Sequence, residues 1–103
     1  MNEALFIPED CFSIGGMYPL NKIKRLVIIG TLQKGKLYKD MKATINGKEV
    51  IVIGIEIHNK MSNELIVGEK AGVMVEELTK DDYTNHIKQF RKDGITPTMR
   101  FYE

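Results

Sequence analysis

One segment, residues 50–58 with the sequence VIVIGIEIH, constrains the fold of this chain more than any other. Isoleucine occupies its odd positions Ile51, Ile53, Ile55 and Ile57. Side chains of a strand alternate between its two faces, so the pattern predicts a strand with one branched, apolar face. We expect that isoleucine face to point into a closed core. Gly54 interrupts the segment and indicates a bend or a bulge.

Length and composition limit the class of protein. A chain of 103 residues predicts a single domain, residues 1–103, with one core. Hydrophobic residues make up 43% and charged residues 28%, as is typical of a soluble globular protein. A single cysteine excludes an internal disulfide and is consistent with a reducing compartment. No secretory signal or membrane-spanning apolar run is visible, so we expect a cytoplasmic protein without a membrane partner.

Strand and turn patterns occupy most of the chain. Residues 4–8 form a short extended start, which we expect Pro8 to end. Further strands are expected at residues 9–14, 25–33, 41–45, 48–57, 71–78 and 96–102. Asn46 and Gly47 accept positive φ at both central turn positions, so they predict a tight hairpin. We expect loops at residues 17–24 and in the polar segment 58–70.

The hydrophobic period changes after residue 79 and predicts a helix over residues 80–92. Thr79 is a suitable N-cap, acidic residues follow in the first turn, and Gly94 is suited to the position after the last turn. One apolar stripe consists of Tyr83, Ile87 and Phe90. The stripe either covers an opening or edge of the chain's own sheet, or projects as a contact for a protein partner. The whole pattern predicts a mostly β, small closed barrel with a helical insertion at about residues 79–93.

Five segments resemble the second domain of translation elongation factor Tu, a β-barrel that translational GTPases share. They are PEDCFSIGG at 8–16, VIIGTLQKGKL at 27–37, KDMKATING at 39–47, VIGIEIHNK at 52–60 and LIVGEKAGVMVEEL at 65–78. The resemblance implies the fold of that barrel, present here without a GTPase domain. It also implies a pocket at one end, because the family holds the aminoacylated 3′ end of tRNA there.

Carried over by position, the resemblance implies a set of ligand-binding residues. They are Glu9, Asp10, Phe12, Ile14, Glu56 and His58. The chain has Asn59 where many members have arginine, and Lys70 where the family has asparagine. An apolar floor with an acidic group and an imidazole can stack a base and hydrogen-bond a ribose or an amine. In the alternative interpretation, Phe12 and Ile14 are core residues and the two polar groups are only a rim.

Positive charge is concentrated in residues 20–50, which contain eight basic and two acidic side chains. One interpretation is a patch that faces an anion such as RNA. Its members would be Lys22, Lys24, Arg25, Lys34 and Lys36. The other interpretation is that these lysines protect exposed strand edges and hairpins from pairing with other chains.

No motif predicts catalysis or a cofactor. Residues 30–36, GTLQKGK, match the first seven positions of a phosphate-binding loop, but Leu37 replaces the hydroxyl side chain that would hold Mg²⁺. We therefore expect a strand and a turn there, and no nucleotide cofactor bound by this chain. Cys11, His58 and His86 lack the spacing of metal ligands, and a Cys–His pair would lack an orienting group.

These observations predict a non-catalytic binding module associated with RNA or with translation. Its partner would be the end of a tRNA or a ribosomal RNA, bound through the pocket and the basic hairpins. The alternative is a protein-interaction or structural module, in which the barrel is a scaffold and the helix at 80–92 makes the contact.

Overall fold

A computed structural model describes residues 2–14 and 25–103, and within them the chain forms nine strands and one helix. The strands are β1 (Glu3–Ile14), β2 (Arg25–Lys34), β3 (Leu37–Tyr38), β4 (Lys42–Ile45), β5 (Lys48–Ile57), β6 (Lys60–Ser62), β7 (Glu64–Leu65), β8 (Lys70–Glu76) and β9 (Met99–Tyr102). The helix α1 (Lys80–Lys92) lies between β8 and β9 in sequence. The loop expected at 17–24 lies outside the described residues.

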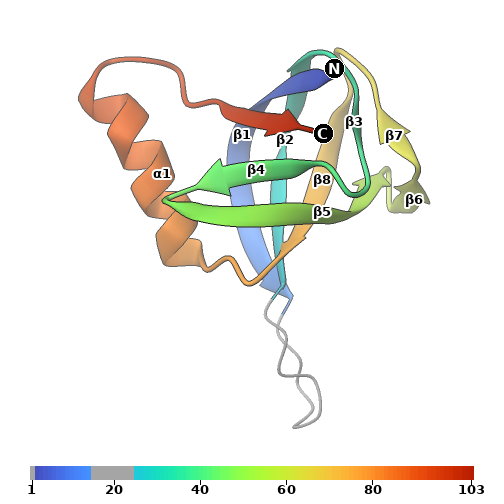
Figure 1. Ribbon diagram of the computed structural model, residues 1–103, viewed down its shortest axis with the longest axis horizontal. Coiled ribbons are helices and arrows are strands. Elements are labelled where there is room, and N and C mark those ends of the chain that lie inside the picture. The colour runs from blue at the N-terminus through green and yellow to red at the C-terminus, as the bar shows by residue number, and fades with distance from the viewer. Residues whose placement is uncertain (1, 15–24) are drawn as a thin grey trace, which may run out of the picture.

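Six antiparallel strands close into a barrel, as the sequence predicts. The order around the ring is β4, β9, β1, β2, β8 and β5, and β4 pairs with β5 to complete it (Figure 1). The β4–β9 side closes through the single pair Lys42 and Tyr102. β6 extends the sheet beyond β5, while β3 and β7 form a separate two-stranded ribbon. Closure leaves few free strand edges on the ring itself.

The predicted hairpin joins β4 and β5. Asn46 and Gly47 have φ angles of 51° and 77°, so both central turn positions adopt the left-handed conformation. Ile45 pairs with Lys48 directly beside the turn. A two-residue turn of this kind matches the twist of the flanking strands and fixes their register.

The expectation that the whole isoleucine row of β5 points inwards is wrong. Val50 and Val52 are the buried residues of the first half of β5, and Ile51 is 44% exposed. The pairing of β5 with β8 then shifts between Val52 and Gly54. This bulge adds one residue, and the odd position Ile55 becomes buried beyond it. The bend predicted at Gly54 is therefore confirmed, and it divides β5 into two halves that bury opposite sets of side chains.

Strand β1 is longer than the sequence pattern predicts, because Pro8 does not end it. β1 runs from Glu3 to Ile14 and pairs with β2 along most of that length. The register shifts between Pro8 and Asp10, which leaves Glu9 as the extra residue of a bulge. Proline is tolerated beside a bulge, because the ladder is interrupted there and the N–H that proline lacks is not required. The polar segment 58–70 likewise contains the short strands β6 and β7.

The helix begins and ends where its sequence signals predict. Thr79 is the N-cap, and it forms a capping box with Asp82, whose backbone N–H donates to the Thr79 hydroxyl at 3.1 Å. At the other end Gly94 has a φ of 69°, and its N–H donates to the carbonyl of Arg91. Within residues 2–14 and 25–103, no helix is long and apolar enough to cross a membrane.

The core fills the barrel and continues under α1. Phe6 and Phe101 meet at its centre with their ring centroids 6.3 Å apart in an edge-to-face arrangement. Tyr83 and Ile87 of α1 belong to the same buried cluster. Figure 1 shows α1 beside the turn of the β4–β5 hairpin, with β6 at the other end of β5. The helix therefore covers one opening of the barrel and not the end near β6.

Candidate ligand-binding groove

An open groove lies on the outer surface of the barrel, where β1, β2, β8 and β5 run side by side. Its volume is about 260 Å³. It is lined by Phe12, Val27, Ile29, Glu56, His58, Asn59, Lys70, Ala71 and Gly72. No residue of α1 is among them, so the helix leaves the groove uncovered.

The floor of the groove is apolar and depends on a glycine. Gly72 pairs with Ile29 on one side and with Glu56 on the other. A Cβ atom at Gly72 would lie 2.8 Å from Cγ1 of Val27, which is too close for a real contact. Val27 is only 4% exposed, although it points away from the barrel core. The missing side chain at Gly72 thus leaves a depression over a packed valine.

A strained turn brings polar groups to one side of the groove. His58 and Asn59 occupy the two central positions of the β5–β6 turn, with φ angles of 52° and 64°. Asparagine tolerates this conformation, whereas histidine adopts it at a cost. Strained backbone is found preferentially at binding sites, where it orients a side chain. The exposed His58 and Glu56 line the groove from this side.

An ion pair also lies at the rim of the groove. The ammonium of Lys70, the first residue of β8, lies 2.8 Å from the carboxylate of Glu9. The bulge at Glu9 in β1 gives this carboxylate its position. Both side chains are exposed, with 63% of Lys70 and 48% of Glu9 accessible to solvent. Such an exposed pair contributes little to stability, so either partner is free to exchange for a ligand group.

The structure brings together some of the residues that the resemblance implies. Phe12, Glu56 and His58 line one groove, and Glu9 lies at its rim through the ion pair with Lys70. Phe12 is 44% exposed, so the interpretation of this ring as a core residue is wrong.

Two predicted ligand residues lie elsewhere. The carboxylate of Asp10 accepts a hydrogen bond from the backbone N–H of Cys11 at 2.8 Å and does not line the groove. Ile14, also exposed and not a core residue, lines a different depression of about 350 Å³ with Ser13, Arg25 and the start of α1.

The predicted basic patch is not one surface in the described residues. Arg25 begins β2 and lies 4.0 Å from Glu76, whereas Lys34 ends the same strand. Ten residues of strand separate the two ends by about 30 Å. Lys36 lies beyond Lys34, after the turn at Gly35, and the predicted Lys22 and Lys24 lie outside the described residues.

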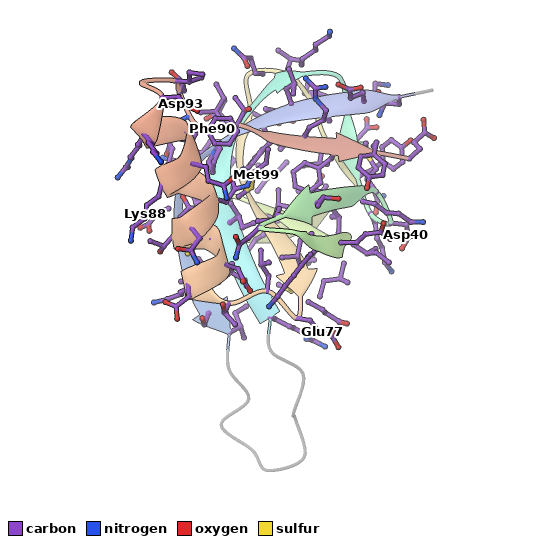
Figure 2. The ribbon with its side chains drawn as sticks, turned by 60° about the vertical axis from the view of Figure 1, so that its left-hand side comes forward. Asp40, Glu77, Lys88, Phe90, Asp93 and Met99 are labelled. Carbon is purple, nitrogen blue, oxygen red and sulfur yellow. The ribbon has the colours of Figure 1, made fainter. Side chains whose placement is uncertain are left out.

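The stripe on α1 packs against the chain's own barrel. Tyr83 and Ile87 are buried, and burial raises the pKa of Tyr83 to about 12. Phe90 is half-buried and lies against the ring of His86, with their centroids 5.1 Å apart. In Figure 2 Phe90 lies on the barrel side of α1 and Lys88 on its outer side. The first of the two alternatives for this stripe therefore holds, and Tyr83 and Ile87 offer no exposed contact to a partner.

The reactive side chains of the described residues are dispersed. Cys11 packs against the core, and burial raises the pKa of its thiol, while His58 lies in the groove on the outer surface. Among residues 2–14 and 25–103, no cluster of three His, Cys, Asp or Glu side chains could hold a metal ion. Residues 30–36 form the end of β2 and the turn at Gly35, as predicted, rather than a loop that leads into a helix.

In the sequence, Asn59 and Lys70 were visible only as departures from the family's pattern and were not assigned to the site. Val27 and Ile29 were also not assigned to the apolar floor. Val27 and Ile29 read as ordinary strand residues, and their place beneath the groove depends on the register between β2 and β8. The available sequence signal was that Lys70 and Gly72 are two residues apart and so share a face of β8. This signal locates Lys70 at the groove only when the pairing of β8 with β5 is known.

The fold and the groove define a class of protein, a closed six-stranded antiparallel barrel with a mixed apolar and charged groove on its wall. A comparison of the sequence with protein-family models found no match.

Proposed function

We propose that this chain is a non-catalytic binding module whose groove holds the end of a single-stranded RNA associated with translation. One observation carries the proposal. Phe12 and Glu56, which are 44 residues apart in sequence, converge with His58 on one open groove that no other part of the described chain covers. These are residues that the resemblance to the elongation-factor barrel implies. A cytoplasmic location is part of the same proposal.

The chemistry of the groove supports an unpaired nucleotide as the ligand. A base can stack against the exposed ring of Phe12 and cover Val27 and Ile29, because every base has a π-face and an apolar plane. Glu56 can accept hydrogen bonds from ribose hydroxyls or an exocyclic amine, and His58 can donate one. A volume of about 260 Å³ is slightly below the usual range of ligand pockets, so the open groove suits one nucleotide unit and not a folded RNA.

The alternative function, a protein-interaction module that uses α1, has less support. Of its three predicted contact residues, Tyr83 and Ile87 are buried in the chain's own core, and only Phe90 remains accessible. The RNA proposal uses side chains that are exposed and close together.

Chemical-shift titration of the full chain with a short CCA-ended RNA tests the proposal. We expect shifts at Phe12, Glu56 and His58, and the affinity of the Phe12→Ala variant should fall by about 1–3 kcal/mol, the usual contribution of one stacked base. Ile51→Ala is the matched control, because Ile51 is also 44% exposed on the outer surface but does not line the groove. Glu56→Gln should also weaken RNA binding, and its control is Glu49→Gln, which lies on the same strand but outside the groove. Absence of any shift at millimolar RNA would contradict the proposal.

A further inference from the structure

We infer that the groove recognises a nucleotide by its phosphate as well as its base, with Lys70 as the phosphate contact and Glu9 as the counter-ion that the phosphate displaces. This inference rests on the proposed function and specifies the ligand. It begins from the ion pair at the rim, where the Lys70 Nζ and the Glu9 carboxylate are 2.8 Å apart.

Lys70 is the one lysine or arginine among the described residues that line the groove. It lies on the same face of β8 as Gly72, two residues away, which corresponds to about 7 Å along the strand. Gly72 pairs with Glu56, so Lys70 is a diagonal cross-strand neighbour of Glu56, and the cation and the carboxylate occupy separate positions beside the apolar floor. A ligand that fills this arrangement carries an anion and hydrogen-bonding groups at separate positions next to an apolar plane, as a nucleotide does.

The charges of the groove determine where a phosphate can bind. Glu56 repels an anion from one side, and Glu9 is the second acidic group near the groove. Among the described residues that line the groove, Lys70 alone offers a phosphate an opposite charge. A phosphodiester of an RNA strand presents two free acceptor oxygens and one full negative charge, as a carboxylate does. A phosphate monoester presents three free oxygens and a larger charge, so either group can replace Glu9 at the ammonium.

Exchange of Glu9 for a phosphate is inexpensive because the pair is exposed. The Lys70 side chain is 63% exposed and the Glu9 side chain 48% exposed, so water competes with their contact and the pair is weak. Glu9 regains full hydration when it is displaced. The two partners therefore act in opposite directions on ligand affinity. Lys70 favours binding, and Glu9 opposes it by occupying the same ammonium.

Titration with adenosine, adenosine 3′-monophosphate and adenosine 5′-monophosphate tests this inference on the full chain. We expect at least one monophosphate to bind about five- to tenfold more tightly than adenosine, the gain from one charge-assisted contact. The two monophosphates represent the two directions of a strand, and the tighter one gives its orientation. The expected shifts lie at Phe12, Gly72 and Lys70.

Two substitutions then have effects of opposite sign. Lys70→Gln should remove the preference for the monophosphate, while Glu9→Gln should increase monophosphate affinity about two- to fivefold by removing the competing carboxylate. Glu3→Gln and Lys42→Gln are the matched controls. Glu3 lies on β1, as Glu9 does, and forms a comparable exposed pair with Arg100. Lys42 is an exposed cation of β4. Neither Glu3 nor Lys42 lines the groove.

Each result has a defined meaning. Equal affinity for adenosine and both monophosphates, no loss in Lys70→Gln, or weaker binding by Glu9→Gln would overturn the inference. In those cases the proposed RNA function would still stand if CCA-ended RNA shifted the groove residues. If neither the RNA nor any of the three small probes shifted the groove, both proposals would be wrong.

Discussion

The carboxylate of Asp82 in the first turn of α1 accepts a hydrogen bond from the ammonium of Lys48 on β5, at 2.8 Å. The same carboxylate accepts from the side-chain amide of Asn46 at 3.0 Å, and from the backbone N–H of Thr79 at 3.1 Å. Asp82 is almost fully buried. One side chain therefore caps its own helix and attaches that helix to the β4–β5 hairpin, so the position of α1 over the barrel opening depends on it.

Replacement of Asp82 should destabilise the fold more than replacement of an ordinary acidic residue in the first turn of a helix. The Thr79 hydroxyl also donates to this carboxylate, so Asp82→Ala leaves four donors without their acceptor and removes half of the capping box. We therefore expect a loss of about 2–4 kcal/mol in unfolding free energy. Asp81→Ala is the control, because Asp81 is an exposed first-turn residue with only a dipole interaction, worth at most about 1 kcal/mol. Urea unfolding followed by circular dichroism measures both. Equal losses would show that Asp82 has no special role.

The same contacts predict acid sensitivity. The hydrogen bond from Lys48, then those from Thr79 and Asn46, lower the pKa of Asp82 well below its usual value near 4. At a pH below the usual pKa near 4, Asp82 of the unfolded chain binds a proton that Asp82 of the folded chain does not. The free energy of unfolding therefore decreases as the pH is lowered. The stabilisation is fully present above about pH 4 and is lost as the pH falls towards the lowered pKa. We expect the stability difference between the native chain and Asp82→Asn to shrink from pH 5 to pH 2. A constant difference would contradict this cause.

Substitutions on α1 distinguish a packed stripe from a docking stripe. Ile87→Ala removes a buried side chain of the core cluster, so we expect a loss of about 2–4 kcal/mol in unfolding free energy. Phe90→Ala removes a half-buried ring and should cost about 1–2 kcal/mol. Thermal unfolding by calorimetry measures both. A larger loss for Phe90→Ala than for Ile87→Ala would mean that the helix packs differently.

Local signals allowed the helix and the β4–β5 turn to be predicted correctly. Thr79 determines the start of α1 and Gly94 its end, and each does so through contacts with residues only a few positions away in the sequence. Asn46 and Gly47 likewise determine their turn through their own backbone preferences. Such features do not depend on the rest of the chain, so a sequence pattern is sufficient for them.

The inward face of β5 could not be predicted in the same way. Its first half is apolar on both faces, with Val50 and Val52 on one and Ile51 and Ile53 on the other. Hydrophobic alternation therefore gave two solutions, and the larger isoleucines suggested the wrong one. Pairing with β4 and β8 decides between them, and the shift at Gly54 then reverses the choice for the second half.

The candidate groove was partly predictable for a related reason. The resemblance to the elongation-factor barrel indicated Phe12, Glu56 and His58 by position. The resemblance also indicated Ile14, but the groove ends before Ile14, because its extent depends on the neighbouring strands. Lys70 was visible in the sequence only as a departure from the family's pattern, and its place at the rim depends on long-range register, which no local pattern contains.

Gly72 and Gly54, one on β8 and one on β5, should respond differently to replacement by alanine. A Cβ at Gly72 meets Cγ1 of the tightly packed Val27 at 2.8 Å, whereas a Cβ at Gly54 meets the flexible end of Met61, which is 65% exposed. We expect Gly72→Ala to cost about 1–3 kcal/mol and to weaken RNA binding, because it fills the floor. Gly54→Ala should change stability by less than about 1 kcal/mol, because Met61 can move away. Paired unfolding and RNA-titration measurements test this. Unchanged RNA affinity in Gly72→Ala would indicate that the ligand does not reach the floor.

The strained turn beside the groove predicts a substitution that improves stability and impairs binding. His58 has a φ of 52°, and asparagine adopts that conformation more readily, so His58→Asn should stabilise the fold by about 0.5–1 kcal/mol. The variant also loses the imidazole that lines the groove, so its affinity for CCA-ended RNA should fall. Asp40→Gly relaxes another non-glycine residue with positive φ, 77°, that does not line the groove, and it serves as a control for the backbone alone. Urea unfolding and RNA titration of both variants provide the comparison. If His58→Asn bound RNA as tightly as the native chain, the histidine would not be retained in this strained conformation for binding.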